Sequence, residues 1–257
     1  MTYCLGVLVN EGLLMMADTR TNAGIDNVSS YKKLHCLADA SDRQIHLATS
    51  GSLSASQTLI GRLREGEGQG GGLAAARSMF GVAEIVGEGL RRANKALLEA
   101  LGPDCGSRGA SLLLGGRIGA ERPRLFQIYA EGNFIECMPE MPFLQIGETK
   151  YGRPILNRVL TSGTPISSAI KMGLLSFDSA IRSNLSVALP IDMMVIPACP
   201  SASSTARRIE KDDPYFDELS RRWSAMLAWA ADEMPEPWFA AEHAAPPSLS
   251  LVADNRG

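Results

Sequence analysis

The chain has 257 residues, of which 45% are hydrophobic, and this is enough apolar material for one large domain with a sizeable core. Its formal net charge of −3, without a basic cluster among aromatic residues, argues against nucleic acid as a partner. The longest apolar runs have the length of strands, far below the ~20 residues of a membrane-spanning helix, so no membrane partner is expected.

The cysteines and histidines do not form a binding pattern. Five cysteines are scattered along the sequence, without metal-ligand spacing or an evident disulfide framework. The histidines, His35, His46 and His243, are not arranged as metal ligands. The start of the chain lacks the basic and apolar regions of a secretory signal. We therefore predict no metal, no cofactor and a cytoplasmic location.

The second residue is the most informative position. A small residue there favours removal of Met1, which would leave Thr2 with a free α-amino group beside its hydroxyl. A threonine paired with an N-terminal amine is a known activated nucleophile. The reference pKa of that amine, near ~8, lets it accept the hydroxyl proton. Threonine is also common at ordinary strand starts, so the case for Thr2 depends on its neighbours.

Polar residues follow the strands predicted after Thr2. Residues 3–9 and 13–17 form a hairpin of two apolar runs joined by a turn, and Asp18 comes directly after the second run. Lys33 lies in a third segment, and residues 44–51 predict another strand that closes on Gly51.

The chemistry of an N-terminal threonine gives each of these residues a role. The Lys33 ammonium would disfavour a second positive charge on the amine and stabilise negative charge on oxygen. Asp18 would hold and orient that lysine. Because strand alternation directs Lys32 to the opposite face, only Lys33 is expected to act. The backbone N–H of Gly51 would serve as oxyanion donor.

The order of these residues carries a family resemblance. The series Thr2, Ala17-Asp18-Thr19-Arg20, Lys32-Lys33-Leu34 and Ala48-Thr49-Ser50-Gly51 resembles N-terminal-nucleophile hydrolases of the proteasome β-subunit type. Residues 1–6, 18–24, 26–27 and 33–35 are closer still to Anbu, the bacterial proteasome-related family also described as an ancestral β-subunit, and more distantly similar to the HslV peptidase. The resemblance implies an α+β fold, a four-layer αββα sandwich. It also implies that the subunits form multimers and that the processed threonine is the nucleophile.

The rest of the chain predicts helices and strands in alternation. Apolar stripes at helical spacing indicate helices over residues 53–63, 74–100 and 166–182, with a glycine-rich loop over 64–72. Strands over 110–118, 124–131 and 133–138 would form the second sheet. Residues 143–147 lead into a helix that ends at Leu160, and an interrupted strand runs over 187–196 through Pro190.

Two motifs depart from the β-subunit pattern. Where that pattern has Gly-Ser-Gly, this chain has Gly147-Glu148-Thr149, so Glu148 or Thr149 would have to replace the serine near the nucleophile. Where it has Asp-x-x-Ser, this chain has Ser183-Asn184-Leu185-Ser186, in which Ser186 matches and Ser183 replaces the aspartate. A serine can hydrogen-bond the amine but supplies no negative charge. We therefore expect altered activity on ordinary proteasome substrates.

The C-terminal part is distinct. We divide the chain into a proteasome-β-like domain over residues 1–200, a helical extension over 201–239 packed on the same domain, and a flexible tail over 240–257. Asp213 and Pro214 predict the start of a helix whose apolar stripe ends before Pro235. We expect a homo-oligomer to which this helix or the 74–100 helix contributes contacts.

Together these features predict a threonine-type hydrolase that cuts amide bonds in peptides or proteins within a self-assembled particle. An unidentified unfoldase or adaptor that delivers substrate is a further possible partner. One alternative keeps the fold and makes the protein a small-molecule amidase. Another is an assembly protein with a weakened, vestigial site. Retention of Thr2, Asp18, Lys33 and Gly51 favours the enzyme.

Overall fold

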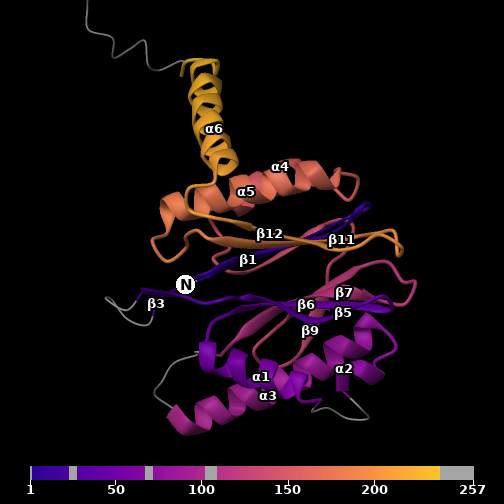
Figure 1. The fold of residues 1–257 in the computed structure, drawn as a ribbon. Helices are drawn as coiled ribbons and strands as arrows, with labels where there is room; N and C mark the ends of the chain where they lie inside the picture. Colours follow the sequence, from indigo (N-terminus) through magenta and orange to yellow (C-terminus); the bar gives the residue numbers. More distant parts are fainter. Residues whose placement is uncertain (1, 23–27, 67–71, 102–108, 238–257) are drawn as a thin grey trace, which may run out of the picture.

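The computed structural model describes residues 2–22, 28–66, 72–101 and 109–237. Asp26, Asn27, most of the predicted glycine-rich loop and the predicted tail lie outside these ranges. Two five-stranded antiparallel sheets face each other, and helices cover the outer face of each (Figure 1). The four-layer αββα arrangement predicted from the resemblance is confirmed.

The first sheet carries the N-terminus on its second strand. Its order is β10 (Phe143–Gly147), β1 (Tyr3–Val9), β2 (Gly12–Asp18), β11 (Ile191–Pro197) and β12 (Thr205–Ile209). The hairpin of β1 and β2 pairs Cys4 with Ala17, and β11 pairs Ile191 with Asp18. Strands from both halves of the chain therefore surround the start of β1.

The second sheet has the order β5 (Leu34–Ala40), β6 (Arg43–Ser50), β7 (Ser111–Ile118), β8 (Arg124–Ile128) and β9 (Phe134–Glu136). Helices α1 (Leu53–Arg64), α2 (Gly72–Ala75) and α3 (Met79–Leu101) lie over it (Figure 1). On the other side, α4 (Arg153–Val159) and α5 (Ile166–Ser183) cover the first sheet, and α6 (Pro214–Asp232) rises from them. The short strands β3 (Arg20–Asn22) and β4 (Val28–Ser30) pair with each other.

Side chains alternate along each strand, so each sheet presents apolar residues to the other sheet and to its covering helices. The result is three apolar layers that hold the sandwich together. Cys4, Met15 and Leu113 belong to the layer between the sheets. Leu5 and its neighbours face α5, and a separate cluster fills the space between the second sheet and its helices. Gly6 allows the sheets to approach closely, since a Cβ there would fall 2.7 Å from Leu125 Cδ1.

The structure corrects three element boundaries. The strand predicted from residue 187 begins only at Ile191, because Pro190 has no N–H for a ladder. The helix predicted from residue 74 is divided, and α3 starts after Ser78, whose hydroxyl accepts the Gly81 N–H at 3.2 Å. The predicted strand over 124–131 ends at Ile128.

The short strands β3 and β4 and the edge strand β12 have no counterpart in the sequence prediction. β12 is an edge strand with four exposed residues and one buried residue, so it lacks the alternating apolar pattern that identifies a strand. It extends the first sheet to residues 205–209, beyond the predicted boundary at residue 200.

Candidate active site

Thr2 lies immediately before β1, where the chain enters the sandwich (Figure 1). The residue is buried, and its carbonyl oxygen accepts a hydrogen bond from the Glu148 N–H at 2.6 Å. Gly147 has a φ of +81°, and a Cβ at this position would fall 2.0 Å from the Thr2 carbonyl oxygen. Only glycine lets the end of β10 come this close, so Gly147 and Glu148 fix the backbone of Thr2.

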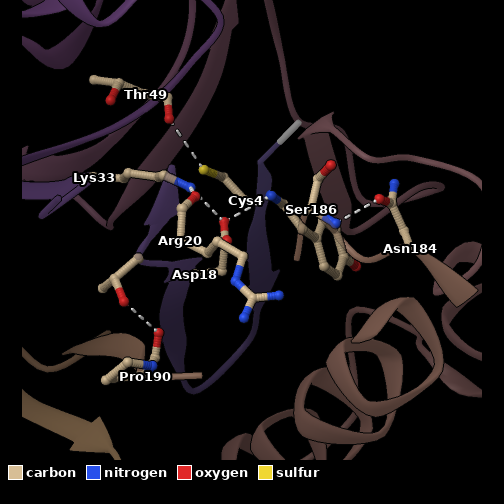
Figure 2. A network of polar contacts seen from close by, with 10 residues as sticks. Cys4, Asp18, Arg20, Lys33, Thr49, Asn184, Ser186 and Pro190 are labelled. Atoms are coloured by element: carbon tan, nitrogen blue, oxygen red, sulfur yellow. Dashed lines mark hydrogen bonds and ion pairs between the residues drawn. The ribbon is translucent and has the colours of Figure 1, made fainter. Parts of the chain in front are cut away.

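A buried ion pair lies beside Thr2. The Oδ1 atom of Asp18, at the end of β2, accepts hydrogen bonds from the Tyr3 N–H and from Lys33 Nζ, each at 2.9 Å. Lys33 Nζ also donates to the Arg20 carbonyl oxygen, and Figure 2 shows Lys33 pointing toward Asp18 and Arg20. Burial raises the pKa of Asp18, while the Lys33 charge acts in the opposite direction. The pair therefore joins the start of β1, the end of β2 and the segment before β5.

Of the two adjacent lysines, Lys33 is buried and Lys32 is exposed. Both residues precede β5, so strand alternation does not separate them, but the buried Lys33 and the exposed Lys32 differ in exposure in the way that the prediction requires. The Lys33 carbonyl oxygen accepts a hydrogen bond from the Thr49 N–H at 3.0 Å, so β6 fixes the lysine backbone from the neighbouring strand. The Thr49 carbonyl oxygen in turn lies 3.5 Å from the Cys4 thiol, which connects β6 to β1 (Figure 2).

Gly51 follows the end of β6 and adopts a φ of +89°. A Cβ at this position would fall 2.3 Å from the Gly109 carbonyl oxygen, so a larger residue would displace the loop before β7. Because the Thr49 N–H bonds to Lys33, Gly51 lies at the same end of the sandwich as the ion pair. Its role as oxyanion donor stays a prediction.

The two motifs that depart from the β-subunit pattern are joined by a hydrogen bond. Glu148 Oε2 accepts a hydrogen bond from Asn184 Nδ2 at 2.7 Å, and Glu148 Oε1 accepts the Lys150 N–H at 2.8 Å. The Ser186 N–H donates to Asn184 Oδ1 at 3.0 Å (Figure 2). Asn184 thus joins Ser186 to the residue that fixes Thr2. Thr149 is half-buried beside Glu148.

Sequence reasoning singled out Ser183 and missed Asn184. Ser183 is the exposed last residue of α5, whereas the next residue, Asn184, turns inward and bonds to Glu148. The signal for Asn184 in the sequence is its place just past the end of a predicted helix, where an amide side chain often bonds to nearby backbone, as Asn184 does with the Ser186 N–H.

The other reactive groups near this site are less suited to nucleophilic chemistry. Burial raises the pKa of the Cys4 thiol well above its usual range, so the thiol stays protonated and donates to Thr49. Among the residues that the structure describes, no three side chains of metal-binding type are grouped to hold a metal ion. No helix in the described ranges has both the length and the apolar character needed to cross a membrane.

Solved structures decide the family. The chain is 41% identical to an Anbu mutant from Hyphomicrobium sp. strain MC1, over 92% of this chain and 99% of that one, with a TM-score of 0.84. The chain belongs to the Anbu family. Anbu from Yersinia bercovieri is 35% identical over 91% of this chain and 98% of its own, with a TM-score of 0.83.

A third Anbu structure, described as the helical assembly of the Anbu complex from Pseudomonas aeruginosa, is 36% identical over 93% of this chain and 99% of its own, with a TM-score of 0.85. A scan against protein-family models and a search of curated proteins gave no match. The structural similarity over almost the whole chain establishes the N-terminal-nucleophile hydrolase fold of Anbu.

Proposed function

We propose that this Anbu protein is a threonine-type hydrolase of peptide amide bonds that uses Thr2 after removal of Met1. The observation that supports the proposal most strongly is the shared carboxylate of Asp18. One of its oxygens accepts both the Tyr3 N–H and the Lys33 ammonium, which places a buried positive charge at the start of the strand that follows Thr2.

In the proposed reaction, the Thr2 hydroxyl oxygen attacks the substrate carbonyl carbon while its proton passes to the α-amine of the same residue. Lys33 stabilises the negative charge that develops on oxygen, and the Gly51 N–H binds the oxyanion. Collapse of the tetrahedral intermediate breaks the C–N bond, and the amine product leaves with the proton. Water then hydrolyses the ester on Thr2 and restores the free hydroxyl.

The auxiliary residues differ from the proteasome β-subunit pattern in charge and position. We propose that Asn184 and Glu148 together hold the Thr2 backbone, and that Ser186 is kept near them by its N–H bond to Asn184. The Glu148 carboxylate adds a negative charge near the N-terminus, where a serine would be neutral.

The related Anbu complex from Pseudomonas aeruginosa is described as a helical assembly, and we propose that this chain also assembles with copies of itself. Peptides or unfolded proteins would be its substrates. The proposed location is the cytoplasm, and the proposed chemistry needs no cofactor.

The decisive test compares wild type with Thr2→Ala on a panel of fluorogenic peptides, after intact-mass measurement of the N-terminus. Loss of one hydroxyl at a chain end should abolish hydrolysis and leave the circular-dichroism spectrum unchanged. Wild-type protein without Met1 that shows no hydrolysis would contradict the proposal, and so would a Thr2→Ala variant that keeps its activity. Hydrolysis of small chromogenic amides but not peptides would instead identify an amidase.

A further inference from the structure

The inner face of β7 ends on a buried arginine. Leu113 lies in the apolar layer between the sheets, and side chains alternate along a strand, so Arg117 points to the same side. Arg117 is 3% exposed. It bonds to the loop that follows β11, and this loop lies at the opposite end of the sandwich from the N-terminus (Figure 1). A positive charge is therefore buried at the end of the molecule away from the candidate active site.

The two acceptors that hold this guanidinium are neutral. Arg117 Nε donates to Gln44 Oε1 at 3.0 Å, and Arg117 Nη2 donates to the Pro200 carbonyl oxygen at 2.6 Å. Nη1 is buried and has no hydrogen-bond partner among the described residues. A guanidinium has five N–H donors, and these acceptors take only two of them. Because an uncompensated buried charge is strongly destabilising, an anion is the partner that the remaining donors require.

The other buried cation, Lys33, provides a contrast within the same chain. Its ammonium lies 2.9 Å from Asp18 Oδ1, so that charge is already compensated. β11 pairs Ile191 with Asp18 at one end and Pro197 with Gly12 at the other, and Arg117 bonds to the loop beyond Pro197. The two cations therefore belong to separate sites at opposite ends of the sheets.

Arg117 lines a cavity of about 540 Å³. Four serines from the turn after β5 and from the loop before β12 line it as well: Ser41, Ser201, Ser203 and Ser204. Hydroxyl donors from two segments, together with a guanidinium from a third, suit the tetrahedral arrangement of oxygens on a phosphate group. The volume is within the range of small-molecule sites, so a phosphate ester also has room.

One carboxylate lines the same cavity. Asp39 Oδ1 accepts hydrogen bonds from Gln44 Nε2 and from the Ser204 hydroxyl, each at 3.4 Å. Asp39 is exposed and is connected to Arg117 only through the neutral amide of Gln44. It therefore orients that amide and leaves the charge of Arg117 uncompensated. Its negative charge also lowers the affinity of the cavity for an anion, which gives a test with a defined sign.

We propose that Arg117 and the serines of this cavity bind the phosphate group of a small molecule. The bound phosphate neutralises the buried guanidinium and connects the end of β7 to the loop before β12. No step of the proposed hydrolysis uses this cavity, so the inference goes beyond the proposed function.

Calorimetric titration of the full-length protein with inorganic phosphate tests the site. Chloride keeps the ionic strength constant, because salt screens exposed charges. We expect a Kd on the order of 1 mM, within the limit of binding free energy per atom for so small a ligand. At about 10 mM phosphate, such a site should raise Tm by about 3–5 °C, since the ligand binds only the folded protein.

Three variants assign the binding to this cavity. Arg117→Met should weaken phosphate binding by at least about tenfold, because it removes the charged donors. Arg122→Met is the matched control, since Arg122 also donates to a backbone carbonyl, that of Asn10, but is exposed. It should bind like wild type. Asp39→Asn should bind phosphate at least about twofold more tightly, because a like charge is removed while an acceptor for Gln44 remains.

Two further probes identify the source of the anion. Phosphoserine that binds at least as tightly as inorganic phosphate supports a phosphate monoester, and weaker binding supports the free ion. Acetate stands for a carboxylate, which an acidic residue of a second copy could supply. Acetate that binds as tightly as phosphate overturns the assignment of a phosphate site.

Two other results overturn the inference. One is wild-type protein that binds no phosphate at about 10 mM, a concentration that would saturate a millimolar site. The other is an Arg117→Met variant that binds like wild type. If Arg117→Met does not fold, Asp39→Asn decides, because an unchanged Kd there means that phosphate binds elsewhere. Peptide hydrolysis by Thr2 is measured separately, so neither result bears on the proposed chemistry.

Discussion

Two adjacent lysines provide an internal comparison at the residue scale. Lys33 is buried and bonds to Asp18, whereas Lys32 is exposed. Lys33→Met should reduce the rate of peptide hydrolysis by about 100-fold or more, because preorganised charge near an oxyanion is typically worth about that much. Lys32→Met should change the rate little.

Rates with a fluorogenic peptide, normalised to folded protein, measure this difference. Loss of a charge that pairs with a buried carboxylate also reduces stability, by about 3–5 kcal/mol for typical buried pairs, so thermal unfolding must be followed in parallel. Equal losses of rate at both positions would show that the wrong lysine has been assigned.

His46 gives a prediction for acid stability. Its imidazole is 1% exposed, and both ring nitrogens lack a hydrogen-bond partner among the described residues. Burial lowers the pKa of His46 to about 4, with the Asp39 carboxylate opposing this shift and the Lys32 ammonium adding to it. In the unfolded chain this imidazole takes up a proton near pH 6.5, whereas in the folded protein it does so only near pH 4. The stability that neutral His46 provides is therefore complete above about pH 6.5 and is lost as the pH falls toward 4.

For this one group, the loss between pH 8 and pH 5 is on the order of 2 kcal/mol. His46→Leu should remove that part of the pH dependence, which urea unfolding at the two pH values can measure. His35, whose pKa burial also lowers to about 4, contributes in the same direction and remains in the variant. An unchanged difference between the two pH values would show that His46 is accessible to protons in the folded state.

At the scale of elements, two glycines have opposite expectations. Gly147 ends β10 with a φ of +81°, and a Cβ there would fall 2.0 Å from the Thr2 carbonyl oxygen. Gly147→Ala should therefore displace Thr2 and sharply reduce hydrolysis. Gly61 lies within α1 with no atom near its Cβ direction, so Gly61→Ala should raise the free energy of unfolding by about 0.5–1 kcal/mol and leave activity unchanged.

Peptide hydrolysis and thermal unfolding of the two variants test this contrast. A fully active Gly147→Ala would mean that the end of β10 can move without displacing the threonine.

Elements with a strong local pattern were predictable, and those defined by distant partners were not. The hairpin of β1 and β2 follows from two apolar runs and a turn, and it places Asp18 at a strand end. The exposed edge strand β12 has no such pattern, because its pairing with β11 defines it. The bond from Asn184 to Glu148 likewise depends on how α5 ends above β10, which spacing along the chain does not encode.

For the whole molecule, the expected state is an assembly of many copies. Light scattering of the purified protein should report a mass several times 27.5 kDa, because large apolar side chains of α6, Met226, Leu227 and Trp229 among them, are exposed in the single chain. Dilution should reduce this mass, since association depends on protein concentration. A monomer at micromolar concentration that shows no change on dilution would contradict both expectations.

The contacts that hold Thr2 also set when a working site can exist during synthesis. The Thr2 backbone is fixed by Glu148, and β2 is flanked by β11, which ends at Pro197. A ribosome that has made only the first half of the chain has made Thr2, but neither β10 nor β11 is present to hold it. If Thr2 is the nucleophile that we propose, the nascent chain carries it before a site has formed around it. On that proposal, an unfinished chain would not cut the other proteins being made beside it.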